Sequence, residues 1–487
     1  MLQLKFFSTW GGVIGLSVLV AGCAVPDTGP RAVLHEASQL QAQATLGDVI
    51  LSDAAWPQGN WWERYADAQL NALVAEALKL SPTLKMAEAR VRQADAITGR
   101  AEAAASPQFG VSERTVRQRF SEHGTTAPPV AGTWKWVSEA TVNGSYEFDF
   151  WGKNRSAIEA AVGIAHAVEA DRHASQLVLV TSILRSYARL QHAWQQHDIA
   201  VETLVQRQHI LELTRQRVTA RIDSSVDLKQ AESLVPAAKV QIAQLDETIQ
   251  LIQAELGALA GQGPDRGLAL TRPALKETGP TRLPSNLPAE LVGRRPDVIA
   301  QRWRVEASGH DIANARAQFY PNISLTGLIG LQSITFTNFD VGGSRIGAFG
   351  PALSLPIFDG GRLKSNLAGR DADYDYAVEQ YNATVIDALR DVVSQLVSLR
   401  AIEQQRALQR EALDTADQAY LLALQRYQGG VGNYLQVLAA QVQLLAAERL
   451  QSDIDMRAFD ADIGLARALG GGLIAQQYTS LRPLLQY

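Results

Sequence analysis

Two stretches of sequence decide the fold of this chain: RVTARIDSSVDLKQAE at residues 217–232 and RYQGGVGNYLQVLAAQ at residues 426–441. Each begins with an Arg that ends a long helical pattern, crosses a short irregular segment and starts a second helical pattern. A shift of 209 positions carries the first stretch onto the second. We therefore expect the chain to make the same helical hairpin twice.

The helical patterns on both sides of these turns are unusually long. We expect long helices over about 153–217 and 363–427, and a rise of about 1.5 Å per residue makes each on the order of 100 Å long. Return helices are expected over about 226–260 and 435–469, the first of them kinked at Pro236. No compact domain needs helices of this length, so the pattern favours a scaffold.

Apolar residues recur in the long helices at the a and d positions of a heptad, which predicts coiled-coil packing. The first seam contains Val180, Tyr187, Trp194, Val201, Ile183, Leu190, Leu204, Leu211 and Val218, and the second contains Val392, Leu399, Leu413, Tyr420 and Tyr427. One polar residue breaks each seam, His197 in the first and Arg406 in the second. We expect both to be satisfied core residues or to mark a level where the packing environment changes.

Apolar and polar residues alternate ahead of each long helix, which predicts strands. We expect strands over about 108–120, 134–150, 321–332 and 347–358. The alternation fits either half-buried soluble hairpins or transmembrane strands. Four transmembrane strands cannot close a barrel, and open edges are not tolerated in lipid, so several chains would have to share one barrel.

A sharp turn is expected between the strands and the long helix in each half. Trp151 and Gly152 mark the first turn, and Pro356, Asp359, Gly360 and Gly361 mark the second. Glycine allows the change of backbone direction, and proline stands where a strand gives up a hydrogen-bond donor.

The composition excludes several classes of protein. A net charge of −5 over 487 residues, with acids and bases interspersed, provides no basic surface for nucleic acid. The single cysteine, Cys23, leaves no disulfide and no cysteine-based metal cluster. Zinc-protease, P-loop and nucleophile-elbow motifs are absent from the sequence. We therefore expect no enzyme activity, no cofactor and no metal.

The N-terminus predicts export and lipid attachment. Residues 1–22 form a basic start, an apolar run and small residues, which is typical of a signal peptide. VAGC, ending at Cys23, is similar to a bacterial lipobox, so we expect acylation of this cysteine; an uncleaved apolar anchor is the alternative. After Cys23 no run of eighteen apolar residues follows, so we expect any membrane span to consist of strands.

These features divide the chain into successive parts. Residues 23–66 are expected to form a tether, 67–262 the first structural repeat, 263–294 a Pro-rich equatorial linker, 295–472 the second repeat and 473–487 a C-terminal tail.

Several motifs connect this plan to a known family: NWWERYADAQLNALV, RRPDVIAQRWRVEA, FYPNISLTGLIG, LPIFDGGRLKSNL and the ALGGG ending. With the lipobox and the two hairpins, they make the sequence resemble the lipoprotein branch of the TolC-like outer membrane factors. The resemblance covers essentially the whole mature chain. It implies an α+β membrane protein that assembles as a homotrimer. Each chain would contribute four strands to one twelve-stranded β-barrel, and this barrel would cross the outer membrane of a Gram-negative bacterium. A long periplasmic α-helical barrel with a mixed equatorial region would continue it.

The resemblance also implies partners and a mechanism. A periplasmic adaptor protein and an inner-membrane efflux transporter would dock on the tube, and this chain would be a passive duct for small molecules such as drugs or aromatic acids. Cys23 would carry S-diacylglycerol and N-palmitoyl groups. An outer membrane duct for type I protein secretion and a purely structural periplasmic coiled coil are the alternatives.

The two turns would be the periplasmic tips of the tube and would form its iris-like gate. Leu435 aligns with an apolar gate residue of the family, and the family's channel-facing aspartates fall on Gln436 and Ala439. We therefore expect the gate to close by packing of Tyr434, Leu435 and Gln436, with weak cation selectivity. The residues expected to latch neighbouring helices, to contact the adaptor or simply to be solvated at the tips are Arg217, Arg221, Asp223, Asp227, Arg426, Gly429, Gly430, Gly432 and Asn433.

Overall fold

The computed structural model describes residues 29, 31–35, 51–52, 56–57, 59–276, 283–284, 293–335 and 342–472. The expected signal peptide, Cys23 and the tail 473–487 lie outside the described residues, as do parts of the tether and of the linker. The chain divides into two compact units. One contains Met1–Leu34, Arg90–Val168 and Gln301–Tyr381, and the other contains His35–Ala89, Glu169–Ala300 and Asn382–Tyr487.

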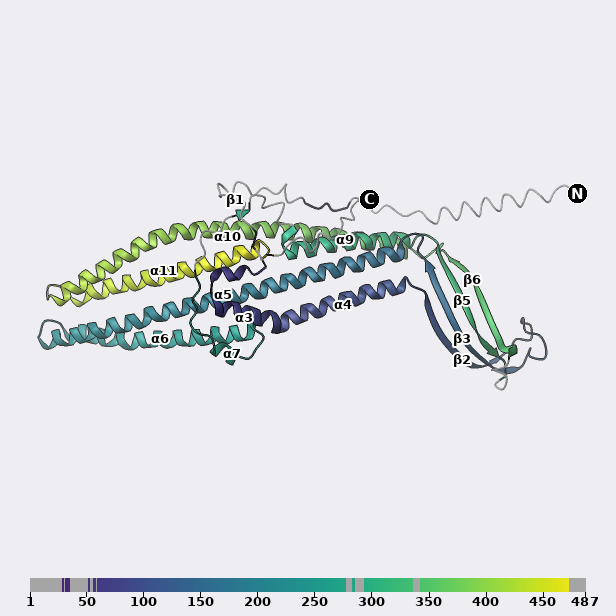
Figure 1. Ribbon diagram of the computed structural model, residues 1–487, viewed down its shortest axis with the longest axis horizontal. Helices are drawn as coiled ribbons and strands as arrows, with labels where there is room; N and C mark the ends of the chain where they lie inside the picture. Colours follow the sequence, from purple (N-terminus) through teal and green to yellow (C-terminus); the bar gives the residue numbers. More distant parts are fainter. Residues whose placement is uncertain are drawn as a thin grey trace. The chain divides into compact units, whose positions relative to one another are not determined.

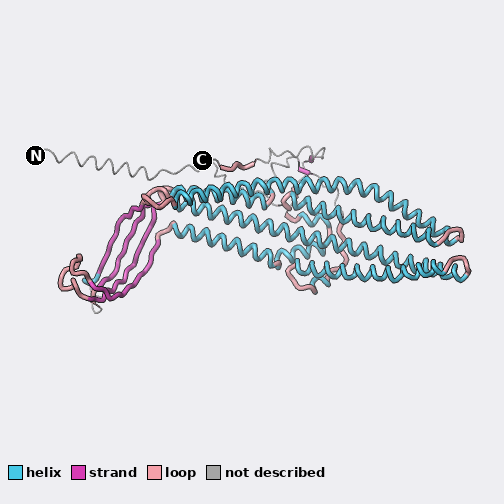
Figure 2. Tube along the Cα trace, turned by 180° about the vertical axis from the view of Figure 1, so that it is seen from behind, coloured by secondary structure: helices cyan, strands magenta, loops and turns pink. Residues whose placement is uncertain are grey.

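The first unit contains a four-stranded antiparallel sheet, drawn in magenta in Figure 2. Its strands are β2 (Gln108–Arg119), β3 (Trp134–Phe148), β5 (Asn322–Ser333) and β6 (Arg345–Ser354), in the order β2-β3-β5-β6. Four strands per chain were expected, and this number is confirmed for the sheet. Two strands stop at least two residues earlier than expected: β3 ends at Phe148, not at 150, and β6 ends at Ser354, not at 358. Pro356 lacks the donor that would prolong the β6 ladder.

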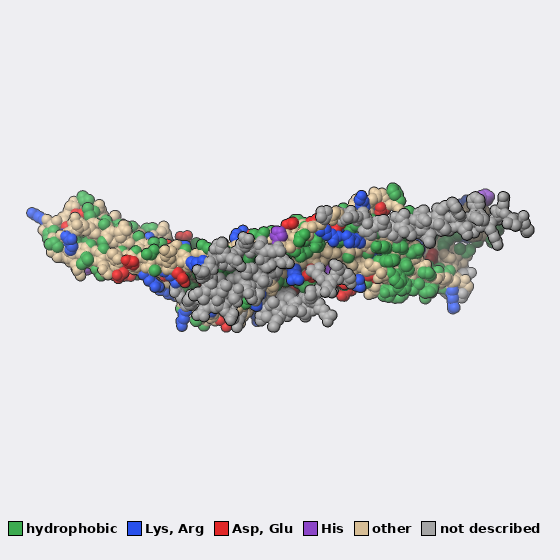
Figure 3. All heavy atoms as spheres, turned by 90° about the horizontal axis from the view of Figure 1, so that it is seen from above, with side chains coloured by type: hydrophobic (Ala, Val, Ile, Leu, Met, Phe, Trp, Pro, Cys, Tyr) green, Lys and Arg blue, Asp and Glu red, His purple; other side chains and the backbone are tan. Residues whose placement is uncertain are grey.

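One row of cross-strand partners shows that one face of the sheet is apolar and exposed. Phe109, Gly144, Gly327 and Phe349 are consecutive cross-strand partners. The Phe109 and Phe349 rings, 79% and 80% exposed, lie over the two glycines. Exposed apolar residues continue along the same face at Val111, Val142, Ile329 and Leu353. Figure 3 shows the resulting dense group of hydrophobic side chains over the strands.

The first unit also fixes a short piece of the N-terminal tether. Arg31 forms an ion pair of 2.9 Å with Asp371, and the Ala32 backbone N–H donates to Asp375 over 2.8 Å. Both carboxylates belong to α10 (Arg362–Gln428). Residues 31 and 32 are therefore bound to the surface of this helix.

The second unit contains two helical hairpins (Figure 1). The first joins α5 (Lys153–Thr219) to α6 (Ser225–Leu259), and the second joins α10 to α11 (Tyr434–Ala468). Both long helices, which begin in the first unit, have 67 residues, and both return helices have 35. Pro236 lies inside α6, and the helix continues through it without a break.

The polar residues that break the two heptad seams have equivalent partners. His197 lies 3.3 Å from Asp246 of α6, and Arg406 lies 2.8 Å from Asp455 of α11. Each break therefore pairs a long helix with its own return helix. Both residues are therefore paired, but they lie at half-buried positions and not in the core.

Aromatic residues from the N-terminal part of the chain complete the core of the second unit. Trp61, Trp62 and Tyr65 of the 3₁₀ helix η2 (Trp61–Tyr65) pack with α3 (Ala68–Leu80) against α5, α6 and α11. Asp67 caps α3 by accepting from the Leu70 N–H over 3.0 Å, and it also accepts from the Tyr187 hydroxyl over 3.0 Å. The remaining elements are α4 (Pro82–Ala104), α7 (Asp265–Leu268), α9 (Pro296–Ala317), the 3₁₀ turn η3 (Gly342–Ser344) and the short parallel pair β1 (Leu51–Ser52) and β4 (Leu283–Pro284). Within the described part of the chain, no helix is both long and apolar enough to cross a membrane.

Candidate functional site

The two hairpin tips have the same backbone turn. The Ile222 N–H donates to the Arg217 carbonyl over 2.9 Å, and the Val431 N–H donates to the Arg426 carbonyl over 3.0 Å. The left-handed position of the turn is occupied by Arg221 (φ 57°) in the first tip and by Gly430 (φ 78°) in the second. A side chain at this position costs about 1–2 kcal/mol, so the first tip is strained where the second is not.

Each return helix begins with a side-chain cap. Ser224 accepts from the Asp227 N–H over 3.3 Å, and Asp227 accepts from the Ser224 N–H over 3.0 Å, which makes a reciprocal capping box. Asn433 caps α11 by accepting from the Gln436 N–H over 3.0 Å. The carboxylate of Asp227, expected as a latch or docking group, is therefore bound within its own turn.

Arg217 connects the two tips. Its guanidinium donates twice to Asp223, over 2.9 and 3.1 Å. It also donates across to the second hairpin, to the carbonyl oxygens of Tyr427 over 2.8 Å and of Gly432 over 3.4 Å. Arg217 is only 8% exposed. Because hydrogen bonds to a charged donor are stronger than neutral ones, this buried cation is a firm link between the hairpins.

Tyr427 reaches in the opposite direction, from the second hairpin into the first. Its hydroxyl donates to Asp223 over 2.5 Å and lies 3.0 Å from the Thr214 hydroxyl oxygen. The Arg217 guanidinium lies over its ring, 4.3 Å from the centroid. Tyr427 is fully buried. Three residues of the first hairpin therefore hold one side chain of the second, and we call Thr214, Arg217, Asp223 and Tyr427 the tip network.

The tip network shifts the ionisation of its members. Burial acts to raise the pKa of Asp223, but hydrogen bonds from Arg217 and Tyr427 and the Arg217 charge outweigh it and leave the pKa below its ordinary value. Burial, followed by the hydrogen bond to Asp223, raises the pKa of Tyr427 to about 12. At neutral pH Asp223 is therefore ionised and the Tyr427 hydroxyl keeps its proton.

An apolar cluster supports the tip network. It contains Ile210, Leu211, Ala231, Tyr420, Tyr427, Tyr434, Val437 and Leu444. A cavity of about 10 Å³ remains between Arg207, Tyr434 and their neighbours. The Tyr434 hydroxyl and the Arg207 Nε atom are both buried without a hydrogen-bond partner among the described residues. The cavity has the size of one water molecule.

The predicted gate residues do not share one environment. Leu435 is 56% exposed, and Gln436 and Ala439 are also exposed on α11. Tyr434 is 2% exposed, because its ring packs inside the chain, 6.5 Å from that of Tyr427. The expectation that Tyr434 packs with Leu435 and Gln436 at the gate surface is wrong for this residue, since successive helix positions point about 100° apart.

The predicted tip residues also divide into two groups. Arg217 and Asp223 lie in the tip network, and Gly432 contributes its carbonyl oxygen. Arg221, Arg426, Gly429, Gly430 and Asn433 are exposed at the tips. Tyr427 was expected only in the heptad seam, and no role was expected for Thr214. A hydroxyl-bearing residue at the end of a seam, next to an Arg, was the available signal for Tyr427.

The two strand-to-helix turns lie in the first unit. Trp151 stacks on Tyr320 with ring centroids 4.9 Å apart and donates to the Pro321 carbonyl over 2.8 Å. Gly152 has φ 72°, and Gly360 and Gly361 have φ 65° and 88°. Asp359 caps α10 by accepting from the Leu363 N–H over 2.9 Å. Pro356 follows the end of β6. These residues therefore build the turns, as their types suggested.

The geometry of the hairpins and the sheet agrees with what is known of one family. The model of the outer membrane efflux protein family matches residues 73–262 and 287–471. The chain belongs to this family. Each matched range contains one hairpin of this outer membrane efflux protein. Within the described residues, no group of three or more His, Cys, Asp and Glu side chains is placed to hold a metal ion.

Curated relatives of this outer membrane efflux protein include resistance proteins. It is 38% identical over 364 residues to the fusaric acid resistance protein FusA of Burkholderia cepacia, with 74% of this chain and 68% of that protein covered. It is 31% identical over 474 residues to the multidrug resistance outer membrane protein MdtP of Escherichia coli strain K12, with 94% of this chain and 95% of that protein covered.

Solved structures agree with this assignment. The outer membrane protein VceC of Vibrio cholerae is similar with a TM-score of 0.81 and 37% identity, over 86% of this chain and all 100% of that chain. The Campylobacter jejuni CmeC outer membrane channel has a TM-score of 0.83 over 93% of this chain and 98% of that chain, and its 22% identity supports the fold alone. The resemblance to the TolC-like outer membrane factors is confirmed, and the function of this chain is that of an outer membrane efflux channel.

Proposed function

We propose that three copies of this outer membrane efflux protein form one duct, with a shared twelve-stranded barrel and a periplasmic helical tube. Strands β2 and β6 are at the two ends of the sheet order, so each has one neighbour within the chain. The other side of each strand carries unpaired backbone groups, which lipid does not tolerate. Pairing β6 of one copy with β2 of the next satisfies these groups in a closed ring.

The distribution of aromatic residues supports a membrane position for the sheet. Trp134 and Trp136 lie near one end of β3, and Phe148 and Trp151 lie at or just beyond the other. All four are exposed in the single chain. Transmembrane barrels have an apolar outer band between two such aromatic girdles, and the Phe109 and Phe349 face of the sheet supplies that band.

Lipid attachment at Cys23, as S-diacylglycerol with an N-palmitoyl group, completes the membrane contact. Arg31 is held on α10 by Asp371. The eight residue steps from position 23 to position 31 extend to at most about 29 Å. Asp371 lies nine residues after the start of α10, which is about 14 Å of helix. The tether is therefore long enough for the acyl chains to reach the level of the strand-to-helix turns.

The tip network carries the proposed gating mechanism. It binds the second hairpin to the first through buried charge-assisted contacts, and no movement of one hairpin away from the other can keep them. We infer that these contacts belong to the closed state and that docking of a periplasmic adaptor stabilises the separated state. Leu435, Gln436 and Ala439 would face the narrowed channel, and Arg221, Arg426, Gly429, Gly430 and Asn433 would be available to the adaptor.

The matching hairpins support an origin by duplication. Equal helix lengths, equal turns and the equivalent pairs His197–Asp246 and Arg406–Asp455 all agree with a tandem repeat. Duplication supplies two rim hairpins per copy, hence six in a trimer, enough to surround a hollow tube.

The proposed cargo is a small molecule, such as a drug or an aromatic acid. Relatives named for resistance to fusaric acid and to multiple drugs support this class. Energy would come from an inner-membrane efflux transporter, and this chain would act as a passive duct without catalysis or a cofactor.

The gate is tested by single-channel conductance of the purified full chain in planar bilayers. Asp223→Asn removes the charge that holds Arg217 and Tyr427, so we expect open conductance to be more frequent at neutral pH. Glu232→Gln is the matched control, because Glu232 forms an exposed ion pair of 2.8 Å with Lys229 near the same tip. Equal conductance of Asp223→Asn and wild type would falsify the gating role. The assembly is tested separately by gel electrophoresis of the wild-type protein. The absence of a trimer band that heating dissociates would contradict the assembly.

A further inference from the structure

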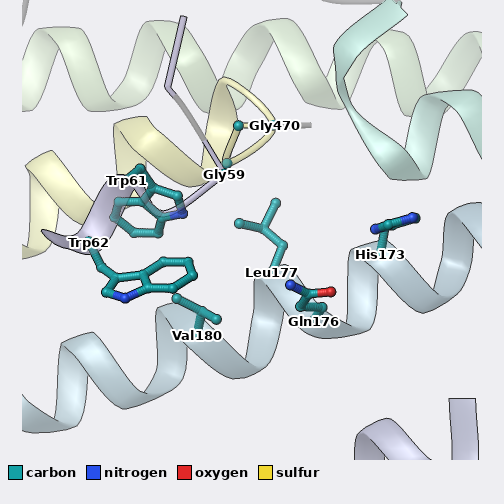
Figure 4. Close-up of a pocket in the computed structure, with 10 residues that line it drawn as sticks. Gly59, Trp61, Trp62, His173, Gln176, Leu177, Val180 and Gly470 are labelled. Carbon is teal, nitrogen blue, oxygen red and sulfur yellow. The ribbon is translucent and has the colours of Figure 1, made fainter. Parts of the chain in front are cut away.

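A partly enclosed cavity of about 210 Å³ lies in the second unit, remote in sequence from the tip network. Its walls are Trp61 and Trp62 of η2 and Leu177 and Val180 of α5, with His173 and Gln176 along the same helix (Figure 4). Gly59 and the three glycines that follow α11 complete the lining. Most of the walls are apolar, and an apolar void forfeits the dispersion contacts that a close-packed interior makes.

The chain leaves α11 directly beside this cavity. Gly470, Gly471 and Gly472 have φ values of 89°, 59° and 83°, a run that only glycine adopts without strain. The Gly471 N–H donates back to the Ala466 carbonyl over 2.9 Å, which closes the helix end. This hydrogen bond and the three positive φ values determine the direction in which the backbone leaves the helix.

The same glycines bring the backbone against the cavity wall. A Cβ atom at position 471 would lie 2.2 Å from the Leu177 Cδ1 atom, and one at position 470 would lie 2.4 Å from the Arg294 carbonyl oxygen. Leu177 itself lines the cavity. The three glycines therefore guide the chain close over α5, and the last of them, Gly472, itself lines the cavity.

We propose that the cavity is a docking site for the C-terminal segment 473–487 of the same chain, entered by the side chains of Leu473 and Ile474. These are the first two residues after Gly472, so with at most about 3.6 Å per residue they lie within about 7 Å of a lining residue. Eight of the fifteen residues in the segment are apolar (Leu473, Ile474, Ala475, Tyr478, Leu481, Leu484, Leu485 and Tyr487). Such a segment gains from covering an apolar wall.

This docking gives the second hairpin a fixed end. Gly470 follows α11, whose other end starts at Tyr434 beside the tip network. A seated tail binds the far end of α11 to α5 through Leu177 and Val180. When the hairpins separate at the tips, the far end of α11 would then remain attached to α5. Release of segment 473–487 would weaken this attachment.

Disulfide trapping in the full-length protein tests the docking. Cys23 is the single native cysteine, and the proposed thioether to its lipid leaves it no free thiol, so Leu473→Cys is combined with Val180→Cys in the otherwise native chain. A disulfide requires Cβ atoms about 3.5–4.5 Å apart, so we expect this pair to cross-link under mild oxidation. Gln486→Cys with Val180→Cys is the control and should remain reduced. No cross-link at 473, or equal cross-linking at 473 and 486, overturns the proposal.

Thermal unfolding supplies a second measurement that does not depend on thiols. Leu473→Asp places a charge where an apolar side chain is expected, and we expect the Tm to fall by about 3–6 °C. Gln477→Asp introduces the same charge in the same segment and should change the Tm by less than about 1 °C. Equal Tm values for the two variants contradict docking by Leu473.

Discussion

The guanidinium of Arg217 lies 4.3 Å from the ring centroid of Tyr427 and donates over 2.8 Å to the carbonyl oxygen of the same residue. Arg217 is in the last turn of α5 and Tyr427 in the last turn of α10. One side chain thus contacts both the ring and the backbone of the other hairpin. Separation of the hairpins must expose a buried cation, which ties the energy of gating to this pair.

The Tyr427 hydroxyl is expected to strengthen closure. Tyr427→Phe keeps the ring under Arg217 but removes the contacts to Asp223 and Thr214, at a cost of about 1–3 kcal/mol. We expect more frequent channel opening in bilayer recordings. Tyr420→Phe is the control, because Tyr420 lies buried in the same cluster and, among the described residues, its hydroxyl forms no hydrogen bond to the tip network. An equal effect of both variants would show that the contacts of the Tyr427 hydroxyl to Asp223 and Thr214 have no special role in closure.

Arg217 and Asp223 are expected to act as a unit. Arg217→Met leaves a buried carboxylate and Asp223→Asn leaves a buried cation, so each alone destabilises the closed tip. The double variant should lose less than the sum, with a coupling energy of about 1–3 kcal/mol. Closed-state occupancy from single-channel recordings measures all three variants. Strict additivity would contradict a direct interaction.

Acid should open the gate through Asp223. A carboxyl group whose pKa is lowered by folding contributes stability that is present above its unfolded pKa of about 3.9 and is lost as pH falls through the folded value. We therefore expect leak conductance to rise below about pH 4 and to be constant up to neutral pH. Asp223→Asn should abolish this acid response, and a wild-type rise near pH 6 would point to another group.

Alkali should weaken the same network through Tyr427. A tyrosine with a raised pKa contributes stability that is present below its unfolded pKa of about 10. That contribution is lost as pH rises through the folded value of about 12. Tyr427→Phe has no such proton and should lack the alkaline rise in conductance that wild type shows. A persistent rise in the variant would assign it elsewhere.

Substitutions at the left-handed position should affect stability in opposite directions in the two turns. Arg221→Gly relieves a left-handed residue, whereas Gly430→Ala creates one where nothing within 4 Å would obstruct the new Cβ atom. We expect Arg221→Gly to be neutral or stabilising and Gly430→Ala to cost about 1 kcal/mol. Thermal unfolding of both variants measures this difference. Gly369→Ala, in α10 with open space at its Cβ position, controls for a general effect of adding a methyl group.

Channel selectivity should depend on position 436. Gln436→Asp would place one carboxylate per copy on the exposed face of α11, and converging carboxylates attract cations. We expect the cation-to-anion permeability ratio to rise in bilayer recordings. Gln425→Asp, on the exposed surface of α10, should leave the ratio unchanged. Strong cation preference in wild type would contradict the assignment of Gln436 to the narrow part of the channel.

Much of the fold could be predicted because its signals are local. Two periodicities, seven residues in α5 and α10 and two in β3 and β5, identify helices and strands without knowledge of their partners. The turns carried their own residue types, as at Gly152, Asp359 and Gly430. The ends of β3 and β6 were harder to predict, because a strand stops where its neighbour stops pairing.

The site was less accessible to prediction, since proximity across hairpins leaves no mark in a single sequence. Arg217 and Asp223 are six residues apart and were selected together. Tyr427 lies 210 positions beyond Arg217 and had only a packing role in the heptad pattern. Tyr434 was assigned to the gate with its neighbours, although one step along the helix turned it into the core.

By itself, the sequence determined the elements of this protein: two equal hairpins, four alternating strands and the residue types of each turn. Backbone preferences and apolar periodicity act over a few residues, so they can be read in one dimension. Only the tertiary structure decided that Arg217, Asp223 and Tyr427 form one buried network and that Leu435 remains outside it. The reason is physical: burial and charge pairing depend on which helices pack together, and that packing is a property of the folded chain.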